Sequence, residues 1–183
     1  MKPMNKLTTS FALAVLISAP AVLAQSAGEK TGVNSALGIS PTTQDFVTEA
    51  ANSDMLEIAA AKLAQEKGNP DEKKFAEGMI TDHTKTSQQL AAMVKSGDVK
   101  ADVPTMLDSS SQKKLDEVRD AKPSNFASVY DPMQVSAHKD AVSLFERYSK
   151  SGDNPKLKDW TGKTLPTLQH HLEMAEALDK KRD

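Results

Sequence analysis

The chain has 183 residues, of which 38% are hydrophobic and 26% charged, so it is long enough for one domain with one core. Its 23 basic and 25 acidic residues are interspersed, which excludes the basic patch that nucleic-acid-binding proteins require. The absence of cysteine excludes disulfides, thiol chemistry and lipoprotein acylation. Stability must therefore come from core packing.

Residues 1–24 have the pattern of a secretory signal peptide. Two lysines precede an apolar run over residues 11–17, and Val-Leu-Ala at residues 22–24 provides a compact cleavage site. The apolar run is shorter than the ~20 residues that span a bilayer, which argues against an uncleaved anchor. We therefore expect a periplasmic protein that begins at Gln25. Removing two lysines and no acidic residue would change the net charge from −2 to −4.

The first long helix is expected from Pro41 to about Lys67, after a flexible linker. Residues 25–40 show no sustained hydrophobic period, which is typical of a tether. Thr42 or Thr43 is the expected N-cap of the helix. Residues spaced by four and three form its inward row, in which Glu57 is surrounded by Phe46, Ala50, Ser53, Ala60 and Ala64.

The second helix is expected from Pro70 to about Ser96. In Gly68-Asn69-Pro70 the glycine permits a left-handed stop, the asparagine caps the next helix, and the proline suits its first position. So short a loop implies an antiparallel hairpin. The inward row of this helix contains His83 together with Ala76, Ile80, Ser87, Leu90 and Val94.

A long connection follows, with a short helix expected at residues 108–120. Its length permits a crossover, so that the third helix would run parallel to the second. The third helix is expected from about Pro123 to Ser151, with His138 beside its inward row and a bend or restart at Pro132.

The fourth helix is expected from Pro155 to about Lys180. Gly152-Asp153-Asn154-Pro155 has the same order of glycine, asparagine and proline as the first loop, so the chain resembles two helical hairpins. His171 lies in the inward row, whereas His170 falls outside it. Pro166 lies inside this helix.

Glu57, His83, His138 and His171 are expected to meet in one layer of the bundle. At ~1.5 Å per residue and with the crossover, the four side chains lie at similar depths, one on each helix. Three imidazoles and one carboxylate suit a single transition-metal ion such as copper, zinc or iron. The sequence therefore predicts a mononuclear, histidine-rich centre and assigns no catalytic residue.

Four further residues have a weaker claim to the same site. Asp82 is placed to accept a hydrogen bond from a ligand histidine on a neighbouring helix. Met79 and Met174 lie three or four residues from a histidine, and their thioethers would favour copper, although methionine also fills bundle cores. His170 is the least favoured ligand.

Two other functions fit the same residues. In a non-enzymatic structural or protein-interaction module, the Glu and His layer would only fix helix register. Its imidazoles and Glu57 would then be hydrogen-bonded by Ser53, Thr86, Ser87 and Thr164. An oxidoreductase or peroxidase-like enzyme would in addition need a metal with an open coordination position. For an exported chain the expected partner is another protein of the envelope.

Several motifs resemble a bacterial secreted family, domain of unknown function 4142, whose members are often labelled outer membrane proteins. They are Phe75-Ala76 with Met79-Ile80-x-Asp82-His83-Thr84, His138 six residues before Leu144-Phe145, and Leu165-Pro166 with His171-Leu172. The resemblance covers residues 41–180 and implies a ferritin-like four-helix bundle with the crossover. It implies no established activity. Ferritin-like di-iron proteins use Glu-x-x-His motifs, and this sequence has none.

Overall fold

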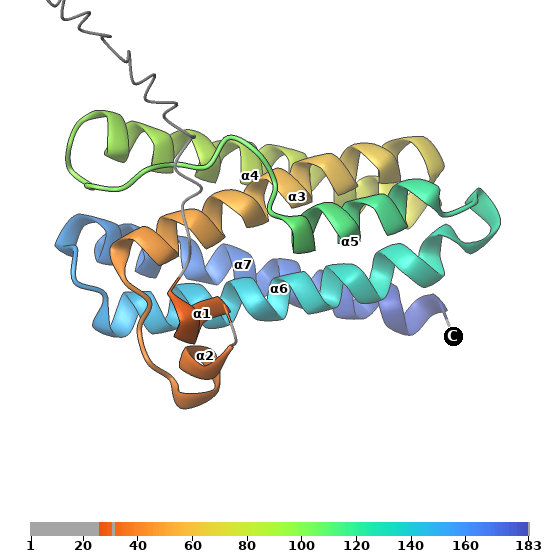
Figure 1. Cartoon of the computed structure of the whole chain (residues 1–183). Helices are drawn as coiled ribbons and strands as arrows, with labels where there is room; N and C mark the ends of the chain where they lie inside the picture. Colours follow the sequence, from red (N-terminus) through yellow and green to blue (C-terminus); the bar gives the residue numbers. More distant parts are fainter. Residues whose placement is uncertain (1–25, 31, 183) are drawn as a thin grey trace, which may run out of the picture.

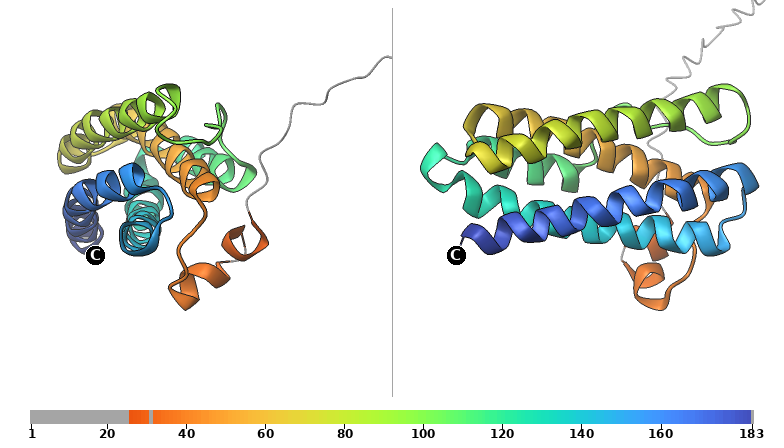
Figure 2. Two further views of the ribbon diagram at one scale, coloured as in Figure 1. Left: turned by 90° about the vertical axis from the view of Figure 1, so that its left-hand side faces the viewer. Right: turned by 180° about the vertical axis from the view of Figure 1, so that it is seen from behind.

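The computed structural model describes residues 26–30 and 32–182. Four long helices lie side by side along most of the molecule (Figures 1 and 2). No strand occurs among the described residues, so the predicted all-α bundle is confirmed. The four helices are α3 (Thr43–Lys67), α4 (Pro70–Lys95), α6 (Phe126–Ser151) and α7 (Pro155–Arg182).

The chain crosses over between the two hairpins, as predicted. After α4 it returns along the bundle through α5 (Ser109–Asp120), which packs on α3, and the short 3₁₀ helix η1 (Pro123–Asn125) (Figure 1). Lys67, at the end of α3, donates hydrogen bonds to the carbonyls of Arg119 and Ala121. Helix α6 therefore starts at the end of the bundle where α4 starts, and the two run parallel.

The helix caps are largely those expected, with one correction at Gly68. Thr42 caps α3, since its hydroxyl accepts from the Asp45 amide at 3.1 Å, and Asn69 forms a capping box with Glu72. Gly68 is extended, with φ −71°, and not left-handed. A Cβ there would lie 2.6 Å from the carbonyl oxygen of Ala64, so close approach is what requires glycine.

Helix α6 continues through Pro132, so of the expected bend or restart the restart does not occur. A proline removes one amide donor from the helix and leaves the carbonyl four residues earlier without its usual partner. Pro132 and Ser128, the residue that loses its donor, are both exposed, so water can bond the freed carbonyl. Pro166 and Gly162 in α7 have the same exposed arrangement.

Residues 26–30 and 32–39, within the stretch expected to be a flexible linker, lie against the bundle. They contain two short helices, α1 (Ala27–Lys30) and α2 (Val33–Leu37). Arg147 of α6 holds this segment through Glu29, at 2.6 Å, and through the carbonyl of Ile39, at 2.7 Å. The sequence period did not predict this because the helices are too short to show one and the anchor is a long-range ion pair. The expected signal peptide, residues 1–24, lies outside the described residues.

The core consists of two apolar clusters with a polar layer between them. One contains Phe46, Leu90, Leu144 and Leu168, and the other contains, among others, Ala60, Phe75, Met79, Tyr130 and Ala175. The four helices pass from one cluster to the other, and the predicted site residues occupy the positions between. Within the part of the chain that is described, no helix combines the length and apolar character needed to cross a membrane.

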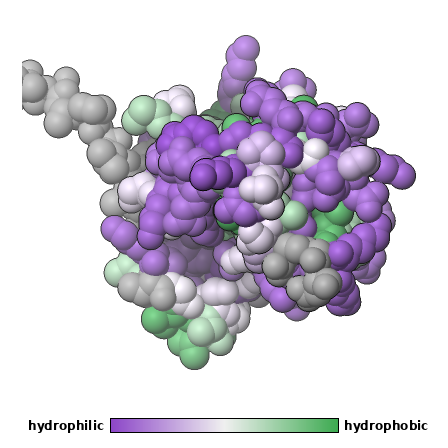
Figure 3. Space-filling model, turned by 90° about the vertical axis from the view of Figure 1, so that its right-hand side faces the viewer, coloured by the Kyte–Doolittle hydropathy of each residue, from purple (hydrophilic) through white to green (hydrophobic). Residues whose placement is uncertain are grey.

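The face of the molecule in Figure 3 is mostly hydrophilic, and a hydrophobic area lies over α2. Val33, Leu37 and Ile39 are between 47% and 68% exposed. Figure 3 shows a hydrophobic group at the lower edge of the molecule, where Figure 1 places α2. This area belongs to the segment that contains α1 and α2, and it does not line the interior of the four-helix bundle.

Candidate metal centre

His83, His138 and His171 meet in the polar layer, one each from α4, α6 and α7. Their ring centroids are 5.8 Å apart for His83 and His138, 5.5 Å for His83 and His171, and 5.6 Å for His138 and His171. One ring nitrogen of each lies within 4.8 Å of the other two. All three residues are at most 2% exposed. Three of the four residues that were expected in one layer, His83, His138 and His171, therefore lie together.

Each histidine is oriented by a hydrogen bond on one ring nitrogen. His83 Nδ1 lies 2.9 Å from Asp54 Oδ1, and His171 Nε2 lies 2.9 Å from Asp82 Oδ2. His138 Nδ1 donates to the backbone carbonyl of Gln134, also at 2.9 Å. Such bonds to carboxylates or carbonyls fix the tautomer and the direction of the other nitrogen in metal sites.

The opposite nitrogen of each ring has no partner. His83 Nε2, His138 Nε2 and His171 Nδ1 are all buried without a hydrogen bond. Because the bonded nitrogens carry the protons in the neutral rings, the lone pairs lie on these free atoms. Buried polar atoms normally have partners, so three exceptions on neighbouring rings make this layer the candidate site.

Glu57 lies beside the histidines but outside their compact set. It is 1% exposed, and neither carboxylate oxygen has a hydrogen-bond partner. Its negative charge helps to raise the pKa of His83 and opposes the lowering of the His138 pKa by burial, so it acts electrostatically on both rings. Among the described residues, however, the group whose ligand atoms all lie within 4.8 Å comprises the three histidines only.

The electrostatic environment differs among the three rings. Burial dominates at His171, whose pKa falls to about 4 despite the Asp82 hydrogen bond, and burial also lowers the pKa of His138. At His83 burial acts in the same direction, but the hydrogen bond to Asp54 and the nearby negative charges raise the pKa overall. Burial raises the pKa of Asp54, so Asp54 and His83 compete for a proton.

The weaker candidates fall into three groups. Asp82 bonds His171 as anticipated, whereas His170 is on the surface, 3.8 Å from Glu173. Met79 and Met174 pack in the apolar cluster below the histidines.

The hydroxyl network expected for a purely structural layer is not the one observed. Thr86 donates to Asp54 at 2.8 Å and Thr164 donates to the carbonyl of Trp160 at 2.9 Å. Neither of these hydroxyl groups therefore supplies the hydrogen bond expected for an imidazole. The imidazole partners are Asp54, Asp82 and the Gln134 carbonyl.

Two hydrogen-bond partners of the histidines were not predicted from the sequence: Asp54, which bonds His83, and the Gln134 carbonyl, which bonds His138. Asp54 precedes Glu57 by three residues on α3 and is 6% exposed, so it shares the inward face. That spacing of three residues could have identified Asp54 as a second acidic residue on the inward face. The Gln134 amide and the Tyr130 hydroxyl are also buried without partners on the same row of α6 as His138.

Comparisons with known proteins give a family and a fold. The profile of the family described as "Domain of unknown function (DUF4142)" matches residues 28–178. A solved structure titled "CopM in the Cu(II)-bound form" superposes with a TM-score of 0.66 at 17% identity and covers 79% of this chain and 100% of its own. At that identity the likeness shows a shared fold. No curated protein matches the chain.

Proposed function

We propose that this chain, which belongs to the family of domain of unknown function DUF4142, binds one transition-metal ion through His83, His138 and His171. The observation that carries this proposal is the set of three buried ring nitrogens without partners, on rings whose other nitrogens are held by Asp54, Asp82 and a carbonyl. Three imidazoles whose ring nitrogens lie this close together suit zinc, copper, iron or nickel as ligands.

Glu57 completes the proposed centre. A buried carboxylate without a hydrogen bond or a cation is costly, by several kcal/mol in real proteins. A divalent cation among the histidines would supply the missing counter-charge. Glu57 would bind as the fourth ligand or balance the charge from outside the coordination shell.

Copper is the metal to test first. Imidazole nitrogens bind Cu(II) well, and Cu(II) stands near the top of the affinity order of divalent metals. The similarly folded CopM was solved in a Cu(II)-bound form, which supports the same choice. Zinc and iron remain the other two metals in the proposal.

We place this metal-binding module in the bacterial envelope. Residues 1–24 have the Lys, apolar and small-residue order of a signal peptide, which supports export. An exported protein without cysteine that holds one ion in a buried site would serve in metal binding or in a stress response linked to metal. The function of the centre is then storage or transfer of the ion, and no catalytic step is assigned.

The test uses untagged protein purified from the envelope fraction of the organism that produces it, without added metal. Elemental analysis is expected to find about one transition-metal ion per chain, and mass spectrometry is expected to find a chain that begins at Gln25. A polyhistidine tag must be absent because it would itself bind metal. Full-length protein in the cytoplasm would contradict export. Purified protein without any transition metal would contradict metal binding.

The competing function is a structural layer that fixes the register of the helices. The observation in its favour is that every triad histidine has one good hydrogen bond within the protein. This function leaves the three free nitrogens and both oxygens of Glu57 unexplained. It predicts no response to metal, which separates it from the proposed centre.

A further inference from the structure

The seam between α4 and α7 contains two cavities, one on each side of the histidine layer. The first, of about 300 Å³, is lined by α4 residues that precede His83 and α7 residues that follow His171. The second, of about 220 Å³, is lined by the stretch of α4 from Asp82 to Gln89 and the stretch of α7 from Trp160 to Thr167. The two cavities therefore lie along a single seam on either side of the buried centre.

The second cavity touches the hydrogen bonds that hold the triad. Asp82 lines it, has a side chain that is 39% exposed, and bonds His171, whose side chain is 2% exposed. Thr86 also lines it and donates to Asp54, the partner of His83. Hydrogen bonds thus connect this cavity to two of the three imidazoles, directly from Asp82 to His171 and from Thr86 through Asp54 to His83.

The chemistry of the second cavity suits a hydrated cation. The residues that line it include Asp82 and three threonines, Thr86, Thr164 and Thr167. Asp82 is the one acidic residue of this lining, and carboxylate oxygen suits hard cations. Of the two lysines of the lining, Lys163 is paired with Asp159 at 2.6 Å and Lys85 is exposed. Asp82 is therefore the acidic group that a cation meets there.

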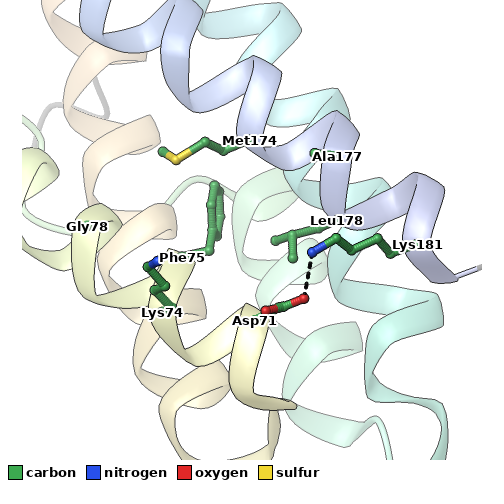
Figure 4. Close-up of a pocket in the computed structure, with 8 residues that line it drawn as sticks. All are labelled: Asp71, Lys74, Phe75, Gly78, Met174, Ala177, Leu178 and Lys181. Carbon is green, nitrogen blue, oxygen red and sulfur yellow. Dashed lines mark hydrogen bonds and ion pairs between the residues drawn. The ribbon is translucent and has the colours of Figure 1, made fainter.

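The first cavity has a different character. Figure 4 shows Met174, Phe75 and Leu178 facing its interior, with the Asp71 and Lys181 ion pair at one side. The ring of Phe75 lies 6.1 Å from that of His138 and forms an apolar wall. None of the residues around this cavity makes the hydrogen bonds that orient the triad. The metal-ligating groups of this wall are the Met174 thioether and the Asp71 carboxylate, which is paired with Lys181, and neither is hydrogen-bonded to a triad histidine.

We propose that the metal ion enters and leaves through the second cavity and that the Asp82 carboxylate is the first protein ligand it meets. This inference rests on the proposed function. A cation on Asp82 competes with the His171 N–H for the carboxylate, which loosens that ring. Once the ion has passed to the triad, the hydrogen bond reforms and holds His171 in place. Asp82 is thus a positioning residue at rest and a transient ligand during exchange.

The experiment compares the same large side chain in each cavity. Thr167→Trp fills the second cavity from an exposed position of α7, and Gly78→Trp fills the first, where a Cβ meets no atom within 4 Å. Copper-loaded protein is mixed with a chromogenic chelator, and the rate of transfer is followed by absorbance. Equilibrium titration with Cu(II) gives the dissociation constant of each variant, and circular dichroism checks folding. If Thr167→Trp does not fold, Lys163→Trp fills the cavity from the same helix.

Thr167→Trp is expected to slow both uptake and release by about tenfold or more, with an unchanged dissociation constant, because it raises the barrier and not the end states. Gly78→Trp should leave the rates unchanged. Asp82→Asn, which keeps an acceptor for His171, should slow uptake. Equal rates in Thr167→Trp and the parent, or slowing by Gly78→Trp alone, would overturn the route. Failure of the parent to bind copper in the titration would instead remove the proposed function itself.

Discussion

Saturating metal is expected to raise the free energy of unfolding by about 2.7 kcal/mol when the free ion is at 100 times its dissociation constant. The reason is mass action, because an ion that binds the folded triad has no comparable site in the unfolded chain. Thermal melts with and without Cu(II), followed by circular dichroism, measure the shift. His83→Ala, His138→Ala and His171→Ala should each lose most of it, since every one removes a ligand.

The matched control for these variants is His170→Ala. His170 neighbours His171 in the chain but is exposed and lies beside Glu173, so its removal should leave the metal shift intact. Equal loss in His170→Ala would mean that the ion binds on the surface. A purely structural layer predicts that no variant responds to metal and that removal of a buried partner costs a fixed 1 to 3 kcal/mol or so.

The pH dependence of the shift has a defined sign. Metal competes with protons for the imidazoles, so the stabilisation should fade below about pH 6. The contribution of His171 to the stability of the metal-free fold should also fall in acid. The pKa of His171 is about 4 in the fold against an ordinary 6.5, so the unfolded chain takes up this proton first and the contribution is lost as the pH drops through that window. The raised pKa of Glu49, about 8, acts in the opposite direction, so the parent is compared with His171→Ala. Melts between pH 4 and 7 check both effects.

Leu90→Asp is expected to unfold the domain or leave it without fixed packing. Leu90 is 1% exposed and belongs to the apolar cluster above the histidines. An aspartate there would be a buried charge without a partner, which costs several kcal/mol and consumes much of the 5 to 15 kcal/mol by which domains are usually stable. Urea unfolding followed by circular dichroism and near-ultraviolet spectra measures the loss.

Ala91→Asp is the matched control for that substitution. It places the same side chain on the next residue of α4, which is exposed, so the expected change is within about 0.5 kcal/mol. A Leu90→Asp variant as stable as Ala91→Asp would show that α4 buries a different face. The positions of His83 and of the whole layer would then have to be reassigned.

Helix positions and the depth of the histidines could be predicted because both follow from local regularities. The spacing of Ala76, His83 and Leu90 fixes the inward face of α4, and the loop at Gly68 fixes where counting starts. The rise per residue then sets the height of each side chain. Only the crossover needed a choice between topologies, and the length of the connection permitted it.

The outer hydrogen bonds could not be predicted so well because they depend on which helices are neighbours. Asp82 could be anticipated from its angle on α4, but its partner could have been on either adjacent helix. The Gln134 carbonyl leaves no trace in the side-chain pattern, since any residue provides one. The anchoring of α1 by Arg147 is likewise a contact between distant residues, and no period in the sequence reports it.

Binding of a metal ion by His83, His138 and His171 is tested by equilibrium titration of untagged, metal-free protein with Cu(II), followed by desalting and elemental analysis. The parent is compared with a variant in which His83, His138 and His171 are all replaced by Ala, with folding checked by circular dichroism. We expect one retained ion per parent chain and none in the triple variant. A parent that retains no ion, or a folded triple variant that retains as much as the parent, would contradict it.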